Sequence, residues 1–157
     1  MTSSETRFPL GSETPEMKFY AKGSREIALS DYLHKKRIVI LFVPTGLAQD
    51  AAGYLGQFEK KDQELNKRDL KIFAVTPEGS ALFDKQFGTN TNIDVVSQKE
   101  VSSAGSESYA RNEPLLILIG KDGTVKLKER HFVDKSALYA VIDAMPMRKS
   151  EMKREKQ

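Results

Sequence analysis

The chain has 157 residues, of which 39% are hydrophobic and 30% charged, as in an ordinary soluble globular domain. It contains no cysteine, which excludes disulfides, thiolate metal sites and cysteine nucleophiles. The formal net charge of +3 is too small to indicate sequence-specific binding of nucleic acid.

The length predicts a single domain with a substantial core. No stretch reaches the roughly 18 apolar residues of a membrane helix, so we expect no membrane span. The first residues lack the apolar segment of a signal peptide. We therefore expect a cytoplasmic protein, or a secreted or periplasmic one if a signal peptide has been removed.

The first strands are predicted from short apolar runs. Residues 1–16, rich in Ser, Thr, Glu, Pro and Gly, predict a flexible N-terminal segment, and 17–21 predict a short strand. The run 38–43 is continuous, apolar and β-branched, which is typical of a central parallel strand covered on both faces. The basic residues 35–37 before it are expected to be solvated.

Helix and strand patterns then alternate. Residues 50–68 carry apolar side chains at a spacing that predicts one amphipathic helix, which Gly53 and Gly56 weaken. The next predicted elements are a strand, a helix and a strand, at 70–75, 80–87 and 93–96. The Ser and Gly residues of 99–110 argue against a stable long helix, so this segment stays ambiguous.

The end of the chain predicts a hairpin and a helix. Strands at 115–119 and 124–128 flank Asp122-Gly123, and Asp-Gly between such runs is a strong hairpin signal. A helix over 134–145 follows and is interrupted by Pro146.

This element order predicts an α/β fold, a mixed sheet with helices on both faces. Its core is expected to contain Ile40, Phe42, Phe73, Val75, Ile117 and Ile119. The predicted divisions are a flexible segment at 1–16, the domain at 17–146 and a basic tail at 147–157.

Two motifs carry a family resemblance. Leu29-Ser30-Asp31, followed by basic residues and the run Ile-Val-Ile-Leu-Phe-Val-Pro, resembles the opening of peroxiredoxins and of membrane-linked thiol-disulfide reductases. Residues 113–123 resemble the closing hairpin of the same enzymes, in which a cis-proline precedes the strand. The resemblance covers 17–145 and implies a thioredoxin-like fold, with a cis Glu113–Pro114 bond beside the turn at 45–49.

A narrower resemblance lies at the C-terminus. Residues 141–149 are similar to a cysteine-poor, thioredoxin-like family of uncharacterised proteins. That family includes bacterial secreted proteins and domains of vertebrate matrix proteins of the sushi-repeat and equarin type. The resemblance implies a binding or matrix role more than an enzyme.

The turn after the first central strand is the first candidate site. In the redox enzymes this turn carries the reactive thiol, but here Leu47 and Asp50, or Ala48 and Ala51, occupy the two aligned positions. Thr45 has no neighbouring base in the sequence that could activate it. The turn is therefore a plain surface turn or a retained partner groove. The groove would be formed by the following residues: Pro44, Thr45, Gly46, Arg111, Glu113 and Pro114.

The tail is the second candidate. Residues 147–157 hold five Lys or Arg and two Glu, so the whole formal positive excess lies there. It is either a solvated helix end or a basic segment that binds an acidic protein, a glycosaminoglycan or anionic lipid. The candidate binding residues are Arg148, Lys149, Lys153 and Arg154. His34 and His131 have no metal-ligand neighbours at suitable spacing, so no metal or cofactor is expected.

We interpret the chain as a non-catalytic thioredoxin-fold module that binds a protein or an acidic polymer. One alternative is a thiol redox enzyme, of peroxiredoxin or reductase type, whose cysteines have been replaced. Another is a small structural subunit of a larger assembly. The sequence does not predict the oligomeric state.

Overall fold

A computed structural model describes residues 9–21, 23, 25–58, 64–84, 92–98 and 103–155. Its strands are β1 (Lys18–Ala21), β2 (Arg25–Ala28), β3 (Arg37–Phe42), β4 (Leu70–Val75), β5 (Ile93–Val96), β6 (Leu115–Ile119) and β7 (Val125–Glu129). Its α-helices are α1 (Ala48–Gly56), α2 (Glu64–Lys67), α3 (Ser103–Arg111), α4 (Lys135–Asp143) and α5 (Pro146–Glu155).

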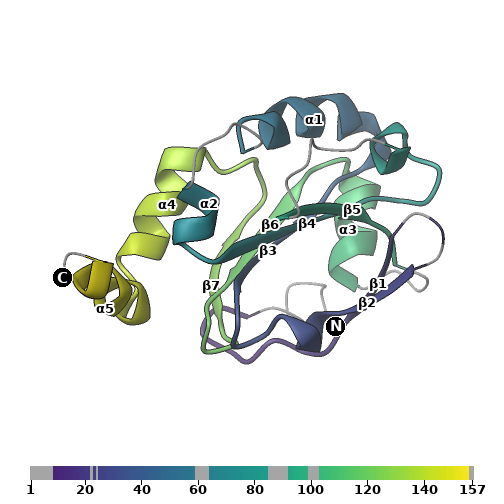
Figure 1. The fold of residues 1–157 in the computed structure, drawn as a ribbon. Coiled ribbons are helices and arrows are strands. Elements are labelled where there is room, and N and C mark those ends of the chain that lie inside the picture. The colour runs from purple at the N-terminus through teal and green to yellow at the C-terminus, as the bar shows by residue number, and fades with distance from the viewer. Residues whose placement is uncertain are drawn as a thin grey trace.

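The main sheet has the strand order β5-β4-β3-β6-β7 (Figure 1). Strand β3 runs parallel to β4 and antiparallel to β6, so that Ile40 lies between Phe73 and Ile117. This mixed sheet with flanking helices confirms the predicted fold class. The four predicted central strands are also confirmed, with β3 and β7 each displaced by one residue.

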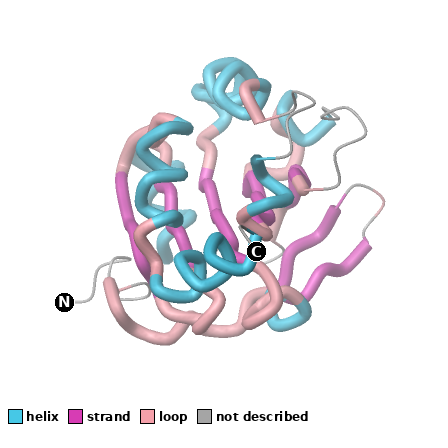
Figure 2. The backbone as a smooth tube through the Cα atoms, turned by 60° about the vertical axis from the view of Figure 1, so that its left-hand side comes forward, coloured by secondary structure: helices cyan, strands magenta, loops and turns pink. Residues whose placement is uncertain are grey.

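Two apolar layers cover the sheet. Alternate residues of β3, including Val39 and Leu41, pack with residues of α1, α2 and α4. The intervening residues, including Ile40 and Phe42, pack with the β1–β2 hairpin, and Tyr109 of α3 lies against the same layer. Figure 2 shows the layers from a second direction, with strands lying between helices. All six predicted core residues are fully buried.

The hairpin between β6 and β7 forms as its turn residues predict. Gly123 has φ +82, a conformation that glycine adopts without strain. The carboxylate of Asp122 accepts hydrogen bonds from the backbone N–H of Thr124 at 2.9 Å and from Lys126 Nζ at 2.8 Å. Burial raises the pKa of Asp122, but these hydrogen bonds and the Lys126 charge outweigh burial and lower it to about 2.

Three helix predictions need correction. The predicted helix 50–68 is two helices: α1 ends at Gly56, a residue type poorly suited to a helix interior, and α2 begins at Glu64. The predicted helix 80–87 is a 3-10 helix at Ala81–Asp84, and 85–87 lie outside the described residues. The ambiguous segment 99–110 contains α3, which begins at Ser103.

The prediction for Arg37 is wrong. It was expected to be solvated with Lys35 and Lys36, but its side chain is fully buried. The reason is long-range: α5 places a carboxylate against it. Pro146 does end the preceding helical pattern, but it also begins α5, since proline suits the first position of a helix.

Part of the predicted N-terminal segment contacts the hairpin. The backbone N–H groups of Gly11 and Thr14 donate to the carbonyls of Val125 at 2.8 Å and Gly123 at 2.9 Å. In the described part of the chain, no helix has the length and apolar character needed to cross a membrane.

Candidate functional site

The turn between β3 and α1 carries no thiol. Of the aligned positions in the two registers, Ala51 is fully buried and Ala48 is 9% exposed, and both belong to the core. Leu47 is half-buried and Asp50 is exposed. Thr45 is exposed, and its hydroxyl has no hydrogen-bond partner among the described residues. The turn therefore offers no activated group for covalent chemistry.

Asn112 lies against the turn and leaves no room for a side chain at Gly46. A Cβ atom on Gly46 would lie 2.6 Å from Asn112 Oδ1, closer than nonbonded atoms approach. Asn112 has φ 55, a left-handed conformation that asparagine tolerates better than most residues. The turn and the segment that precedes β6 are thus neighbours, as the resemblance implies.

The prediction of a cis Glu113–Pro114 bond is wrong, since the bond is trans. The segment is instead held by Ser108, which is fully buried in α3. The Ser108 hydroxyl donates to the Glu113 carbonyl, and the Glu113 N–H donates to the Ser108 carbonyl at 3.1 Å. A cis bond at Pro114 was the reason to expect a binding groove like that of the redox enzymes. That bond is trans here, so this reason is absent.

Charged residues beside the turn pair with one another. Arg111 lies 3.3 Å from Glu107 and 3.9 Å from Glu113, and its side chain is 57% exposed. Arg130 reaches the same oxygen of Glu107 at 2.8 Å. The exposed pairs of Arg111 contribute little to stability.

A second group of charges joins α5 to the body of the domain. We call it the ionic seam, and it comprises Arg37, Arg68, Asp69, Lys121, Asp143, Arg148 and Glu151. Its centre is Glu151, whose two carboxylate oxygens accept from the two terminal nitrogens of Arg37, each at 3.2 Å. Lys121 Nζ lies 2.7 Å from Glu151 and 2.6 Å from Asp69.

The other half of the seam is centred on Asp143. Its carboxylate accepts from Arg68 Nη2 at 2.8 Å and from Arg148 Nε at 3.2 Å. Arg148 also donates to the Lys67 carbonyl at 2.8 Å, and the Arg68 guanidinium stacks on Tyr139 at 4.1 Å. Burial opposes ionisation of Asp143, yet the hydrogen bonds and charges of the two arginines hold its pKa below its usual value.

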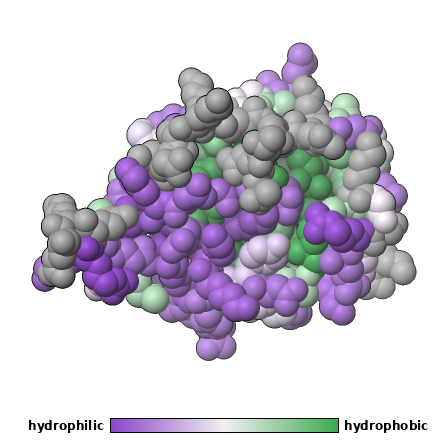
Figure 3. All heavy atoms as spheres, viewed as in Figure 1, coloured by the Kyte–Doolittle hydropathy of each residue, from purple (hydrophilic) through white to green (hydrophobic). Residues whose placement is uncertain are grey.

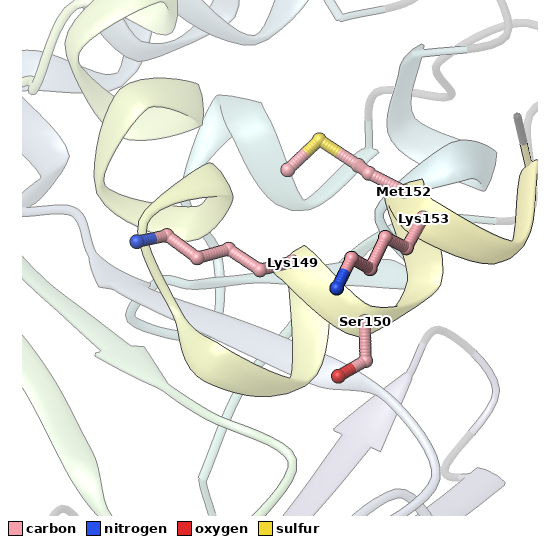
Figure 4. Close-up of a pocket in the computed structure, with 4 residues that line it drawn as sticks. All are labelled: Lys149, Ser150, Met152 and Lys153. Atoms are coloured by element: carbon pink, nitrogen blue, oxygen red, sulfur yellow. The ribbon is translucent and has the colours of Figure 1, made fainter.

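Exposed cations line the outer face of α5. Lys149, Lys153 and Arg154 are exposed and form no ion pair with any described residue. Lys149 and Lys153 line a hollow of about 430 Å³ with Ser150 and Met152 (Figure 4). In that view Met152 extends toward the neighbouring helices and Ser150 points the opposite way. Hydrophilic residues predominate at this end of the molecule (Figure 3).

The structure separates the predicted site residues into two groups. Pro44, Thr45 and Gly46 follow the end of β3 and lie near the segment 111–114. The four α5 residues lie beyond the start of β3, about 20 Å away for a strand of six residues. Arg148 differs from its helix neighbours because it is only 3% exposed and points into the seam.

Sequence reasoning missed Glu151 and Arg37 as partners. They are 114 residues apart, and no local spacing connects them. The one available signal was an arginine directly before a buried strand, a position that demands a counter-charge if the strand is central. Within the described residues, no group of three or more His, Asp or Glu gathers to bind a metal.

Comparisons with known proteins identify a family but no characterised relative. A family model described as a domain of unknown function, DUF4174, matches residues 28–151. No curated protein matches the chain.

Solved structures share the fold. A yeast mitochondrial 1-Cys peroxiredoxin is 15% identical with a TM-score of 0.69, and the match covers 91% of this chain and 78% of that one. The reduced 2-Cys peroxiredoxin of Plasmodium vivax is 15% identical with a TM-score of 0.59, covering 90% and 83%. The exposed lipoprotein thioredoxin Etrx1 of Streptococcus pneumoniae is 17% identical with a TM-score of 0.56, covering 83% and 100%. At these identities the likeness establishes the thioredoxin-like fold alone.

Proposed function

Because this chain belongs to the DUF4174 family of domains of unknown function, and because its turn lacks a thiol, we propose that it is a non-catalytic thioredoxin-fold module that binds an acidic macromolecule. The observation that supports this proposal is the set of unpaired cations on α5, namely Lys149, Lys153 and Arg154. The buried cations of the ionic seam have their own counter-ions, so among the described residues of α5 it is the outer set that is available to a partner.

The proposal uses α5 and leaves the β3–α1 turn aside. The trans bond at Pro114 removes the geometric reason for a groove there. Arg148 is also left out, because its guanidinium is committed to Asp143 and the Lys67 carbonyl. A secreted or matrix setting, implied by the C-terminal resemblance, is part of the proposal.

Retention on heparin and on anionic lipid vesicles at low salt tests the proposal. Replacing Lys149, Lys153 and Arg154 by Gln should abolish retention on at least one of these polyanions. Each cation near an anionic surface contributes about 1 kcal/mol, so the binding should be weak and lost as salt is raised. The native conformation should persist, because these three side chains form no hydrogen bond or ion pair with any described residue.

The matched control replaces three exposed cations elsewhere, Lys18, Arg25 and Lys35, by Gln. Both triple variants lose the same charge, so a specific surface is indicated only if the control is retained like the unaltered protein. If both variants lose retention equally, the binding depends on net charge alone and the proposed surface is rejected.

A further inference from the structure

Arg37 is a buried cation that depends on an anion from outside the sheet. Its side chain is fully buried at the first residue of β3. One terminal nitrogen donates to the Arg68 carbonyl at 2.8 Å, and both terminal nitrogens reach Glu151. Its Nε has no hydrogen-bond partner among the described residues. A charge in this setting is costly unless an anion accompanies it.

The body of the domain supplies a second cation to the same point. Lys121, in the turn between β6 and β7, is 13% exposed and lies 2.7 Å from Glu151. Burial alone would raise the pKa of Glu151, but the hydrogen bonds and charges of Lys121 and Arg37 hold it below its usual value. The sheet therefore forms a cradle for one carboxylate, with the paired donors of Arg37 on one side and an ammonium on another.

The described contacts between α5 and the body of the domain are mainly ionic. None of the described residues of α5 is a buried hydrophobic residue, although Met152 is half-buried, and Met147 is 50% exposed. The residues of α5 that contact the body most closely are Arg148 and Glu151. The group that Arg37 and Lys121 bind is therefore the Glu151 carboxylate, and α5 holds that carboxylate in position.

We propose that Arg37 and Lys121 form a carboxylate-binding site, which Glu151 fills in cis and which a carboxylate ligand supplied in trans can fill in its place. A hollow of about 350 Å³, lined by Lys67, Asp69, Arg148, Glu151 and Arg154, opens beside the site and provides an approach. The carboxylate of Asp69 lies 2.6 Å from Lys121, and its negative charge disfavours a ligand that carries two negative charges. The site therefore suits a carboxylate better than a phosphate dianion. This inference does not depend on the proposed function, because Arg37 and Lys121, which hold the carboxylate, are not among the exposed cations of α5.

Chemical rescue tests the site. Glu151→Ala should lower the thermal midpoint by roughly 5–15 °C, since it leaves a buried arginine without its anion. Sodium acetate at pH 7 should recover at least half of that loss in a saturable manner, relative to sodium chloride at equal ionic strength. Sodium phosphate should recover less. Lys153→Ala, on the same helix and exposed, should show neither the loss nor the rescue.

The double variant Arg37→Met with Glu151→Ala should not respond to acetate. A response equal to that of the single variant would place acetate elsewhere and overturn the proposal, as would a single variant that acetate does not stabilise. If Glu151→Ala is unfolded in chloride, it is refolded from urea in each salt. A native yield in acetate alone supports the site, whereas equal yields, or none in either salt, overturn it.

Discussion

At the scale of single residues, burial decides which side chains of this protein can react and which can only support others. Ala51 occupies a position that carries a cysteine in one register of the redox enzymes, yet it is fully buried in the core. Arg37 and Glu151, which no motif marks, form a two-point ion pair that joins β3 to α5. The position in the fold therefore matters more than the position in a motif.

A cysteine introduced at Ala51 should be a poor nucleophile. Burial raises the pKa of a thiol and limits access, and the described residues place no base beside it. We expect Ala51→Cys to react with a disulfide reagent such as DTNB at least roughly tenfold more slowly than Asp50→Cys, whose position is exposed in the same helical turn. The measurement is the rate of thionitrobenzoate release. Fast reaction at residue 51 would revive the interpretation of a redox enzyme with replaced cysteines.

The carboxylates of the seam should make stability depend on pH. Glu151 and Asp143 have pKa values lowered in the folded protein from 4.5 and 3.8. Their contribution is therefore complete above these values and is lost as pH falls through the lower folded-state values. We expect the thermal midpoint, measured from pH 7 to pH 3, to fall once the pH is below about 4.5. The midpoint of Glu151→Gln should fall less steeply over the same range. Parallel curves for the two proteins would contradict this account.

At the scale of elements, the β6–β7 hairpin depends on contacts as well as on its turn. Gly123 has φ +82, and a Cβ atom there would lie 3.0 Å from the His34 ring. His34 in turn lies 3.1 Å from the Lys121 carbonyl through Nδ1. The hairpin is thus packed against the segment that leads into β3.

Gly123→Ala should destabilise the protein by more than the conformational cost alone. A left-handed alanine costs about 1–2 kcal/mol, and the His34 ring must also move. Gly79→Ala isolates the first cost, because Gly79 has φ +93 with no atom within 4 Å of its Cβ position. Urea unfolding should give a larger loss of free energy for Gly123→Ala. Equal losses would mean that the His34 contact contributes nothing.

Helix α5 is an element that stabilises the domain although it contributes no buried apolar residue. Truncation after Pro146 should cost about 3–5 kcal/mol, since it removes Glu151, the carboxylate that pairs with Arg37. Lys149→Gln with Lys153→Gln should change the free energy of unfolding by less than about 0.5 kcal/mol. Urea unfolding of the three proteins distinguishes them. An unchanged stability after truncation would identify the tail as a free basic segment.

At the scale of the whole molecule, the two candidate surfaces lie at opposite ends of β3. The end that carries the thiol in redox enzymes here holds the turn between β3 and α1, in which Asn112 packs against Gly46. The other end holds the ionic seam and the exposed cations of α5. Any partner that binds α5 is therefore about one strand length away from the turn that carries the thiol in redox enzymes.

The purified protein should show no thiol-dependent activity. Thiolate attack is the basis of both peroxide reduction and disulfide exchange, and the chain has no cysteine. Peroxide consumption with dithiothreitol, and insulin reduction, should not exceed those of a boiled sample. Activity above that control would reveal chemistry that the side chains of the turn do not explain.

Much of the fold was predictable because it depends on local patterns. The continuous apolar run of β3 predicts a strand covered on both faces, and Asp122-Gly123 predicts the hairpin, since each pattern limits the backbone within a few residues. The end of α1 at Gly56 and the presence of α3 were harder to predict. Local helix preferences are weak in both places, so tertiary packing decides the structure there.

The sequence by itself determined the mixed sheet, its core and the absence of cysteine thiols, because strand periodicity and residue identity are local properties. Only the tertiary structure decided that Arg37 is buried, that Glu113–Pro114 is trans and that α5 is joined to the body by Glu151. These outcomes depend on groups up to 114 residues apart. The free energy of a buried charge depends on the counter-ion that the fold brings to it, which no single segment contains.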